Sequence, residues 1–284
     1  MRRFLLHTRD RAQTLDLNTA ALLATEPRGL GNTFAVAYKE TDTRRYPTSV
    51  TPSFEPISFK IYFNADGGDG YASYKRFCRF LTLCGKRPFL LEYDDGVTDK
   101  LCDVLLRSHT KSEIDEDGVL CETLTLERTS YWYEWVQTHF SLETLLSAAS
   151  AHPMRFPLGF VGRRVVRELT VTNPFFEAAP VRVLLCGGIA HPTELTVTDE
   201  SGKTVALLRV TQSVGIGERI VIDPDEKRVT HVAADGTETN AYDLTDKRGC
   251  SFLWLPQGRH RISCNLTGED GGRVELSVKR YLLD

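Results

Sequence analysis

A series of short alternating segments between residues 207 and 265 constrains the fold more than any other part of the sequence. In residues 218–223, Ile220 and Ile222 fall on one face, with the two-residue period of a half-buried strand. Asp235-Gly236 is a hairpin signal, because type I′ turns need positive φ at both central residues. Further strands are expected at residues 228–232, 240–244, 251–255 and 259–266. Short strands at such even spacing predict a β-sandwich.

The N-terminal half carries strand patterns and one clear helix pattern. Asp69 is a suitable N-cap, and Gly85 a suitable C-terminal stop, for a helix between them. Its expected core stripe consists of Tyr71, Tyr74, Phe77, Cys78 and Leu81. Strands are expected at residues 4–15, 34–39, 57–63, 88–93, 101–110 and 119–128. We therefore predict a small β-barrel-like sheet with one packed α-helix.

Residues 40–56 interrupt this pattern. They are polar, they contain Pro47, Pro52 and Pro56, and they offer few apolar anchors. The segment is expected to be an extended arm or a long loop.

Composition limits the classes of function that this chain can have. A net charge of −3 gives no reason to expect nucleic acid or an anionic membrane as a partner. The apolar run at the N-terminus ends at Arg9, too early for a signal peptide, and no segment approaches the ~20 apolar residues of a membrane span. The seven cysteines are scattered without a C-x-x-C pair, so we expect reduced, buried thiols. Synthesis in the cytoplasm of the producing cell follows.

Motifs for catalysis, cofactors or metals are missing from the sequence. It has no G-x-S-x-G elbow, no H-E-x-x-H pair and no phosphate-binding loop with its lysine. The Gly67-Gly-Asp-Gly70 segment precedes a helix, but a hinge explains it better than a phosphate site. We predict no catalytic residue, no cofactor and no metal ligand.

Several short motifs resemble one known family in their order and spacing. They are Pro27-Arg-Gly-Leu-Gly31, the Tyr71-x-x-Tyr74-x-x-Phe77 helix, the Tyr131-Trp132-Tyr133 exit, Asp235-Gly236 and Tyr242-Asp243-Leu244. Together they resemble the distal tail protein of long-tailed, non-contractile bacteriophages. The pattern departs at Phe175, where the family commonly has glycine, and an altered loop is expected there.

The resemblance implies a structural tail protein that is not an enzyme. Its N-terminal domains would form a hexameric hub ring, joining the tail tube to the tail-tip or receptor-binding assembly of the virion. Expected partners are copies of itself, the tail tube protein, the tape-measure protein and the receptor-binding proteins. Domains are expected at 1–136 (ring-forming, with the arm near 40–56), 137–161 (linker with a short helix) and 162–284 (galectin-like or carbohydrate-binding-module-like jelly-roll sandwich).

Two alternatives remain open at this point. The sandwich could serve a carbohydrate-binding adhesin, although Trp254, its best aromatic platform, lies between Leu253 and Leu255 in an expected core strand. A β-sandwich hydrolase is the less favoured alternative, since carboxylate pairs that act across space leave no sequence motif.

Overall fold

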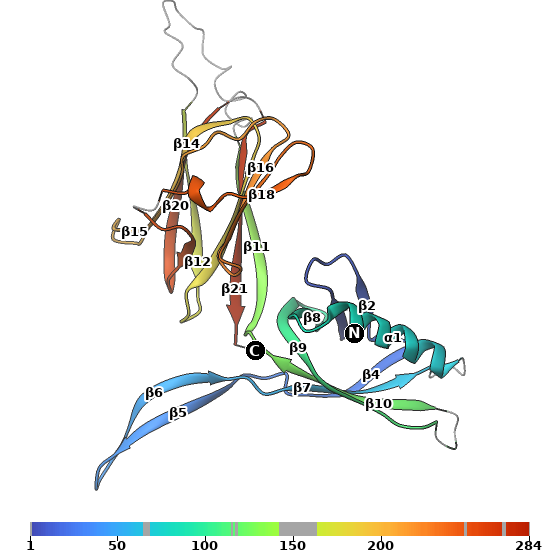
Figure 1. The fold of residues 1–284 in the computed structure, drawn as a ribbon. Coiled ribbons are helices and arrows are strands. Elements are labelled where there is room, and N and C mark those ends of the chain that lie inside the picture. The colour runs from blue at the N-terminus through green and yellow to red at the C-terminus, as the bar shows by residue number, and fades with distance from the viewer. Residues whose placement is uncertain are drawn as a thin grey trace, which may run out of the picture. The chain divides into compact units, whose positions relative to one another are not determined.

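The computed structural model describes residues 2–64, 69–114, 116, 119–141, 164–246, 249–268 and 271–283. The chain divides into two compact units, residues 1–134 with 282–284 and residues 135–281. Antiparallel strands dominate both, and α1 is the one α-helix among the described residues (Figure 1). The mainly β fold class is confirmed.

The first unit is built on one curved antiparallel sheet and a separate hairpin. Its sheet order is β2-β1-β8-β9-β10-β7-β4-β3. The elements are β1 (Arg3–His7), β2 (Thr14–Asp16), β3 (Asn18–Thr19), β4 (Leu22–Arg28), β5 (Thr33–Glu40), β6 (Arg45–Ser53), β7 (Ile57–Phe63), α1 (Gly70–Cys84), β8 (Phe89–Asp94), β9 (Asp99–Lys111), β10 (Leu120–Arg128) and β11 (Trp132–Ser141), which continues into the second unit.

The sheet curls so that its two ends approach each other at Leu17. The Leu17 amide donates to the Phe4 carbonyl at 2.9 Å, and the Leu17 carbonyl accepts from the Ala24 amide at 2.7 Å. These bonds connect β1 to β4, which are distant in the sheet order. The predicted barrel-like form is therefore present.

Strand β7 forms the centre of the core of the first unit. Ile57, Phe59, Ile61 and Phe63 are all buried, as their alternation predicts. The helix α1 packs on this strand, with the Phe77 ring centred 5.6 Å from that of Phe63. Strand and helix thus bury complementary faces, which contributes the hydrophobic stabilisation of this unit.

The ends of α1 agree with the prediction, while its core stripe needs one correction. The Asp69 carboxylate accepts hydrogen bonds from the Tyr71 and Ala72 amides, and Gly85 has a φ of 62° at the C-cap. Tyr71, predicted in the core stripe, is 38% exposed, whereas Phe80 is buried. An α-helix has 3.6 residues per turn, so residues spaced three apart drift around the helix axis. Tyr71, the first residue of the predicted stripe, therefore lies outside the face that packs on the sheet.

One other expectation for this unit was wrong. The single strand expected at 4–15 is a hairpin, in which β1 and β2 pair and Arg11 adopts a φ of 56° in the turn. For 40–56, where an extended arm or a long loop was expected, residues 45–53 form β6 and pair with β5, so the segment is part of an extended hairpin. Sequence propensity did not reveal this pairing, since β6 contains two prolines and buries no side chain.

The second unit is a β-sandwich. One sheet has the order β18-β17-β16-β13-β21-β11, with β19 also beside β13, and the other has the order β12-β20-β14-β15. The elements are β12 (Arg164–Asn173), β13 (Ala179–Cys186), β14 (Ile189–Thr198), β15 (Thr204–Val210), β16 (Arg219–Asp223), β17 (Arg228–Val232), β18 (Glu238–Asn240), the 3₁₀ helix η2 (Tyr242–Leu244), β19 (Leu253–Leu255), β20 (Gly258–Gly268) and β21 (Arg273–Leu282).

The inner faces of the two sheets form one apolar core. Ile220 and Ile222 of β16 belong to it, as predicted, together with Val183 of β13 and Ile262 of β20. The strand expected at 240–244 is wrong, because the chain leaves β18 after Asn240 and turns into η2. An Asn240 side-chain bond to the Tyr242 amide favours this turn over a continued strand.

The first residues of the linker expected at 137–161 belong to a strand. Residues 137–141 are the last part of β11, where Phe140 enters the sandwich core. The short helix expected near 141–149 and the Asp117-Gly118 turn lie outside the described residues. Gly236 has a φ of 86°, as its turn requires, and all seven cysteines are free.

Candidate assembly surfaces

The hairpin of β5 and β6, which we call the arm, extends from the sheet of the first unit as a separate two-stranded sheet (Figure 1). Its register places Phe34, Val36 and Tyr38 of β5 opposite Pro52, Val50 and Pro47 of β6. Residues opposite each other share a face, so one face of the arm is apolar. Thr33, Ala35, Ser49 and Thr51 fall on the other face.

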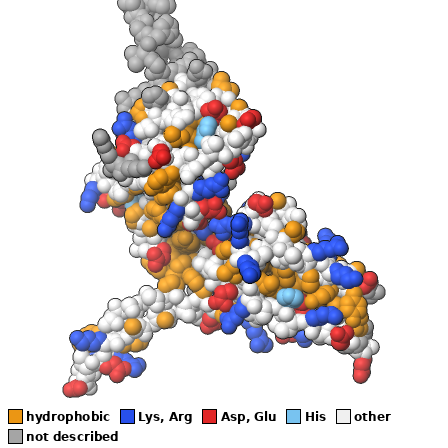
Figure 2. Space-filling view, in the orientation of Figure 1, with side chains coloured by type: hydrophobic (Ala, Val, Ile, Leu, Met, Phe, Trp, Pro, Cys, Tyr) orange, Lys and Arg blue, Asp and Glu red, His pale blue; other side chains and the backbone are white. Residues whose placement is uncertain are grey.

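The apolar face of the arm is open to solvent. Val50 is 59% exposed and Tyr38 51% exposed, and no residue of β6 is buried. Figure 2 shows hydrophobic side chains along the arm and charged ones toward its tip, where Glu40 pairs with Arg45. A hairpin without a covering layer is marginally stable in water. The arm therefore has the character of an unfinished interface.

The base of the arm is held rigidly by side chains from the other end of the unit. Buried Arg128, the last residue of β10, donates through Nη1 to the Gly31 carbonyl at 2.7 Å and through Nη2 to Asn32. The Trp132 indole donates to the Leu30 carbonyl at 2.6 Å. The guanidinium also lies 5.0 Å from the centre of the Phe54 ring. These contacts, here called the clamp, fix both strands of the arm where they leave the sheet.

The clamp depends on the backbone conformation of Gly29 and on the charge of Arg128. Gly29 has a φ of 75°, and a Cβ there would lie 2.2 Å from the Pro56 carbonyl oxygen. Burial lowers the pKa of Arg128, yet a guanidinium keeps its charge. The sequence analysis identified the Gly29-Leu-Gly31 segment but missed Arg128 and Asn32. No local signal connects residues about a hundred positions apart.

A second exposed apolar surface lies on α1. A shallow hollow of about 530 Å³ is lined by Tyr74, Cys78, Leu83 and neighbours on the same helix face. Leu83 is 60% exposed. The ammonium of Lys111 lies 5.0 Å from the Tyr71 ring centre, and burial raises the pKa of Tyr74 to about 12. The hollow therefore offers a mainly apolar contact area, with the free thiol of Cys78 in its lining.

Metal-ligating side chains do not cluster in the part of the chain that is described. Among those residues, no three His, Cys, Asp or Glu side chains gather in a way that could hold a metal ion. None of the described helices is long and apolar enough to cross a membrane. Trp254, expected in the core, is 39% exposed while Leu253 and Leu255 are buried. That correction follows from strand alternation, which turns the middle residue outward.

Comparison with known proteins identifies the first unit. Residues 3–129 match the family described as distal tail protein, N-terminal domain. The first unit is a distal tail protein N-terminal domain.

Solved structures share the fold of the whole chain. A chain of the phage P2 baseplate in its activated conformation with Ca has a TM-score of 0.71 at 15% identity, with 99% of each chain covered. The Dit protein (gp 19.1) of SPP1, described as a paradigm of hub adsorption apparatus, has a TM-score of 0.58 at 12% identity, covering 99% of this chain and 100% of that one. At these identities the likeness concerns the fold. No curated protein matches in sequence.

Proposed function

We propose that this chain is the structural subunit of a tail hub ring. Its first unit would assemble with identical copies into a closed, hexameric ring, and each arm would lie on the neighbouring copy. The observation that carries this proposal is the arm itself: a clamped hairpin that exposes Tyr38 and Val50 on its apolar face. Burying that face on another copy would remove its exposed apolar area from water.

Docking of the arm on a different surface of the next copy would give a ring in place of a two-fold dimer. An arm that docks on a different surface of the next copy makes a heterologous contact, and repeated heterologous contacts either close into a ring or form a filament. A defined ring size then follows from the rotation between copies. The hexameric number comes from the family resemblance.

In the virion, the ring would sit at the tail tip. It would join the tail tube protein and tape-measure protein on one side to the receptor-binding assembly on the other. The likeness to a baseplate chain and to a hub protein supports this placement. The function would be assembly without turnover.

The test measures solution mass over a wide concentration range for the whole chain and for variants of the arm. Removing residues 34–52 deletes the complete hairpin, whereas removing 40–56 would leave β5 without its partner. Val50→Asp places a charge on the apolar face, and Thr51→Asp places the same charge on the opposite face as the matched control. We expect a ring for the wild type and for Thr51→Asp, and monomers for the deletion and for Val50→Asp. If all four proteins form rings with the same number of subunits, the arm is excluded as the contact between copies.

A further inference from the structure

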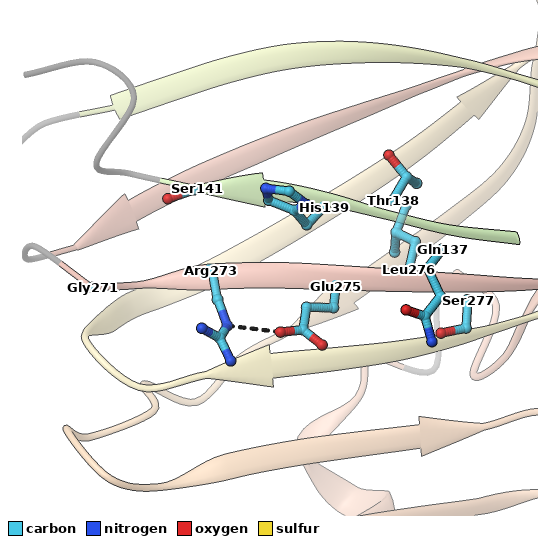
Figure 3. Close-up of a pocket in the computed structure, with 9 residues that line it drawn as sticks. All are labelled: Gln137, Thr138, His139, Ser141, Gly271, Arg273, Glu275, Leu276 and Ser277. Atoms are coloured by element: carbon cyan, nitrogen blue, oxygen red, sulfur yellow. Dashed lines mark ion pairs between the residues drawn. The ribbon is translucent and has the colours of Figure 1, made fainter. Parts of the chain in front are cut away.

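The outer side of α1 and of the turn after it is basic. Between residues 71 and 87 the chain has five lysines and arginines and no aspartate or glutamate. All five are exposed, and within the described residues none of them makes an ion pair: Lys75, Arg76, Arg79, Lys86 and Arg87. Several basic side chains elsewhere do have a carboxylate partner, and Figure 3 shows one such pair, Arg273 with Glu275 at 2.7 Å. The positive charge on α1 is therefore uncompensated by its own chain.

These cations lie around the apolar hollow of the same helix. The hollow, of about 530 Å³, is lined by Tyr74, Lys75, Cys78, Arg79, Thr82 and Leu83. The lining residues recur at helical spacing, so they form one stripe along α1. An apolar hollow among cations fits a partner that brings an apolar side chain together with negative charge.

The turn between β8 and β9 has the opposite character. Asp94, Asp95, Val97 and Asp99, here called the acidic tip, combine three carboxylates with a valine that is 89% exposed. The Asp95 carboxylate accepts a hydrogen bond from the Val97 amide at 2.8 Å, and the Asp94 carboxylate accepts one from the Gly96 amide at 2.7 Å. A turn that is ordered in advance loses little conformational entropy on binding.

The acidic tip and the hollow do not meet within one chain. Every residue that lines the hollow belongs to α1, while Val97 has most of its surface in solvent. Both lie on the first unit, so each copy offers one tip and one hollow. Two copies that join through these different surfaces make a heterologous contact, which is the kind of contact that a ring requires.

We propose that the acidic tip of one copy docks into the hollow on α1 of a second copy. Val97 would bury its side chain against Tyr74 and Leu83. The aspartates of the tip would face Lys75 and Arg79, and these opposite charges would fix the orientation of the two copies. Nucleic acid, which a basic face also attracts, would leave the apolar hollow unfilled. The inference rests on the proposed ring and supplies it with a second contact beside the arm.

Disulfide trapping tests this contact, because the hollow contains the free thiol of Cys78. Val97→Cys is made in the whole chain, which is concentrated and treated with oxidised glutathione. Docking would bring the new thiol beside Cys78 of the next copy, so we expect a non-reducing gel to show a ladder of linked copies beyond the dimer. Val97→Cys combined with Cys78→Ser should give no ladder. Val205→Cys, at an exposed valine of the second unit, is the matched control.

Charge reversal separates docking from random collision. Lys75→Glu together with Arg79→Glu makes the lining of the hollow acidic, so we expect the linking through Val97→Cys to fall by about fivefold or more. Arg259→Glu together with Arg261→Glu reverses two exposed arginines of β20 and should leave the linking unchanged. Circular dichroism of each variant separates a lost contact from a lost fold.

The proposal is overturned if no ladder forms, if linking does not need Cys78, if it stops at dimers, or if the charge reversal in the hollow has no effect. The solution mass of the wild type, measured in parallel, separates this contact from the ring itself. A wild type that forms a ring without linking through Cys78 refutes the docking of the tip and leaves the proposed function intact. A wild type that forms no ring removes both.

Discussion

The carboxylate of Glu122 on β10 lies 3.5 Å from Nδ1 of His109 on β9, and the Glu122 side chain is completely buried. Both of its oxygens lack a hydrogen-bond partner at this distance. Burial raises the pKa of Glu122 to about 7. The protein therefore holds a carboxyl group that is protonated well above its ordinary range, in the same core that α1 covers.

This burial makes stability depend on pH in a defined direction. The pKa of Glu122 rises from 4.5 to about 7 on folding, so between these values the folded state binds more protons than the unfolded state. The contribution of Glu122 is most favourable below pH 4.5, falls as the pH rises through this window, and is level above about 7. The loss over the whole window is on the order of 3 kcal/mol.

Glu122→Gln tests this directly. The amide does not ionise, so the variant should gain stability relative to wild type between pH 5 and pH 8, by on the order of 2 kcal/mol. Urea unfolding at both pH values measures the difference. Glu127→Gln, on the same strand and 43% exposed, is the control. Identical pH profiles for wild type and Glu122→Gln would show that the buried carboxyl does not titrate as stated.

Gly29→Ala should destabilise the first unit. The new Cβ would overlap the Pro56 carbonyl, and the positive φ is unfavourable for alanine. We expect a loss of about 1–3 kcal/mol in the free energy of unfolding. Gly31→Ala is a matched control two residues away, where a Cβ meets no atom within 4 Å. Equal stability for the two variants would contradict the close approach at Gly29.

Arg128→Lys should loosen the arm without unfolding the sheet. Lysine cannot reach the Gly31 carbonyl and Asn32 together with one planar group, so the clamp loses at least one bond, about 1–3 kcal/mol. Limited trypsin digestion measures the effect through cleavage after Arg44 and Arg45 at the arm tip. Cleavage should be several times faster than in wild type. Arg107→Lys, an exposed arginine of β9, should leave the rate unchanged.

Asp69→Ala should weaken α1 at its N-terminus. The carboxylate accepts two backbone N–H bonds there, and loss of an N-cap costs about 1 kcal/mol. Chemical denaturation measures this change, and Asp42→Ala in the exposed turn of the arm is the control. A variant as stable as wild type would mean that solvent replaces the cap without loss.

Much of the fold could be predicted because its signals are local. The alternation of residues 57–63 placed four side chains in the core, and Ile220 and Ile222 did the same for β16. Asp69 and Gly85 marked the ends of α1 through chemistry confined to one turn. These patterns depend only on the positions of residues along the chain, since side chains return to the same face every two residues in a strand and every 3.6 residues in a helix.

The candidate surfaces could not be predicted in this way. The pairing of β5 with β6, the clamp of Arg128 on Gly31 and Asn32, and the burial of Glu122 all depend on residues far apart in the chain.

By itself, then, the sequence determined strands with a clear alternation such as 57–63 and 218–223, where the helix begins and ends, and which family the order of short motifs resembles. Only the tertiary structure decided that residues 33–53 form a clamped hairpin with one apolar face, and that an apolar hollow on α1 lies among exposed basic side chains. The physical reason is that periodicity is a property of neighbouring residues, whereas exposure and charge pairing depend on what the rest of the chain places opposite each side chain.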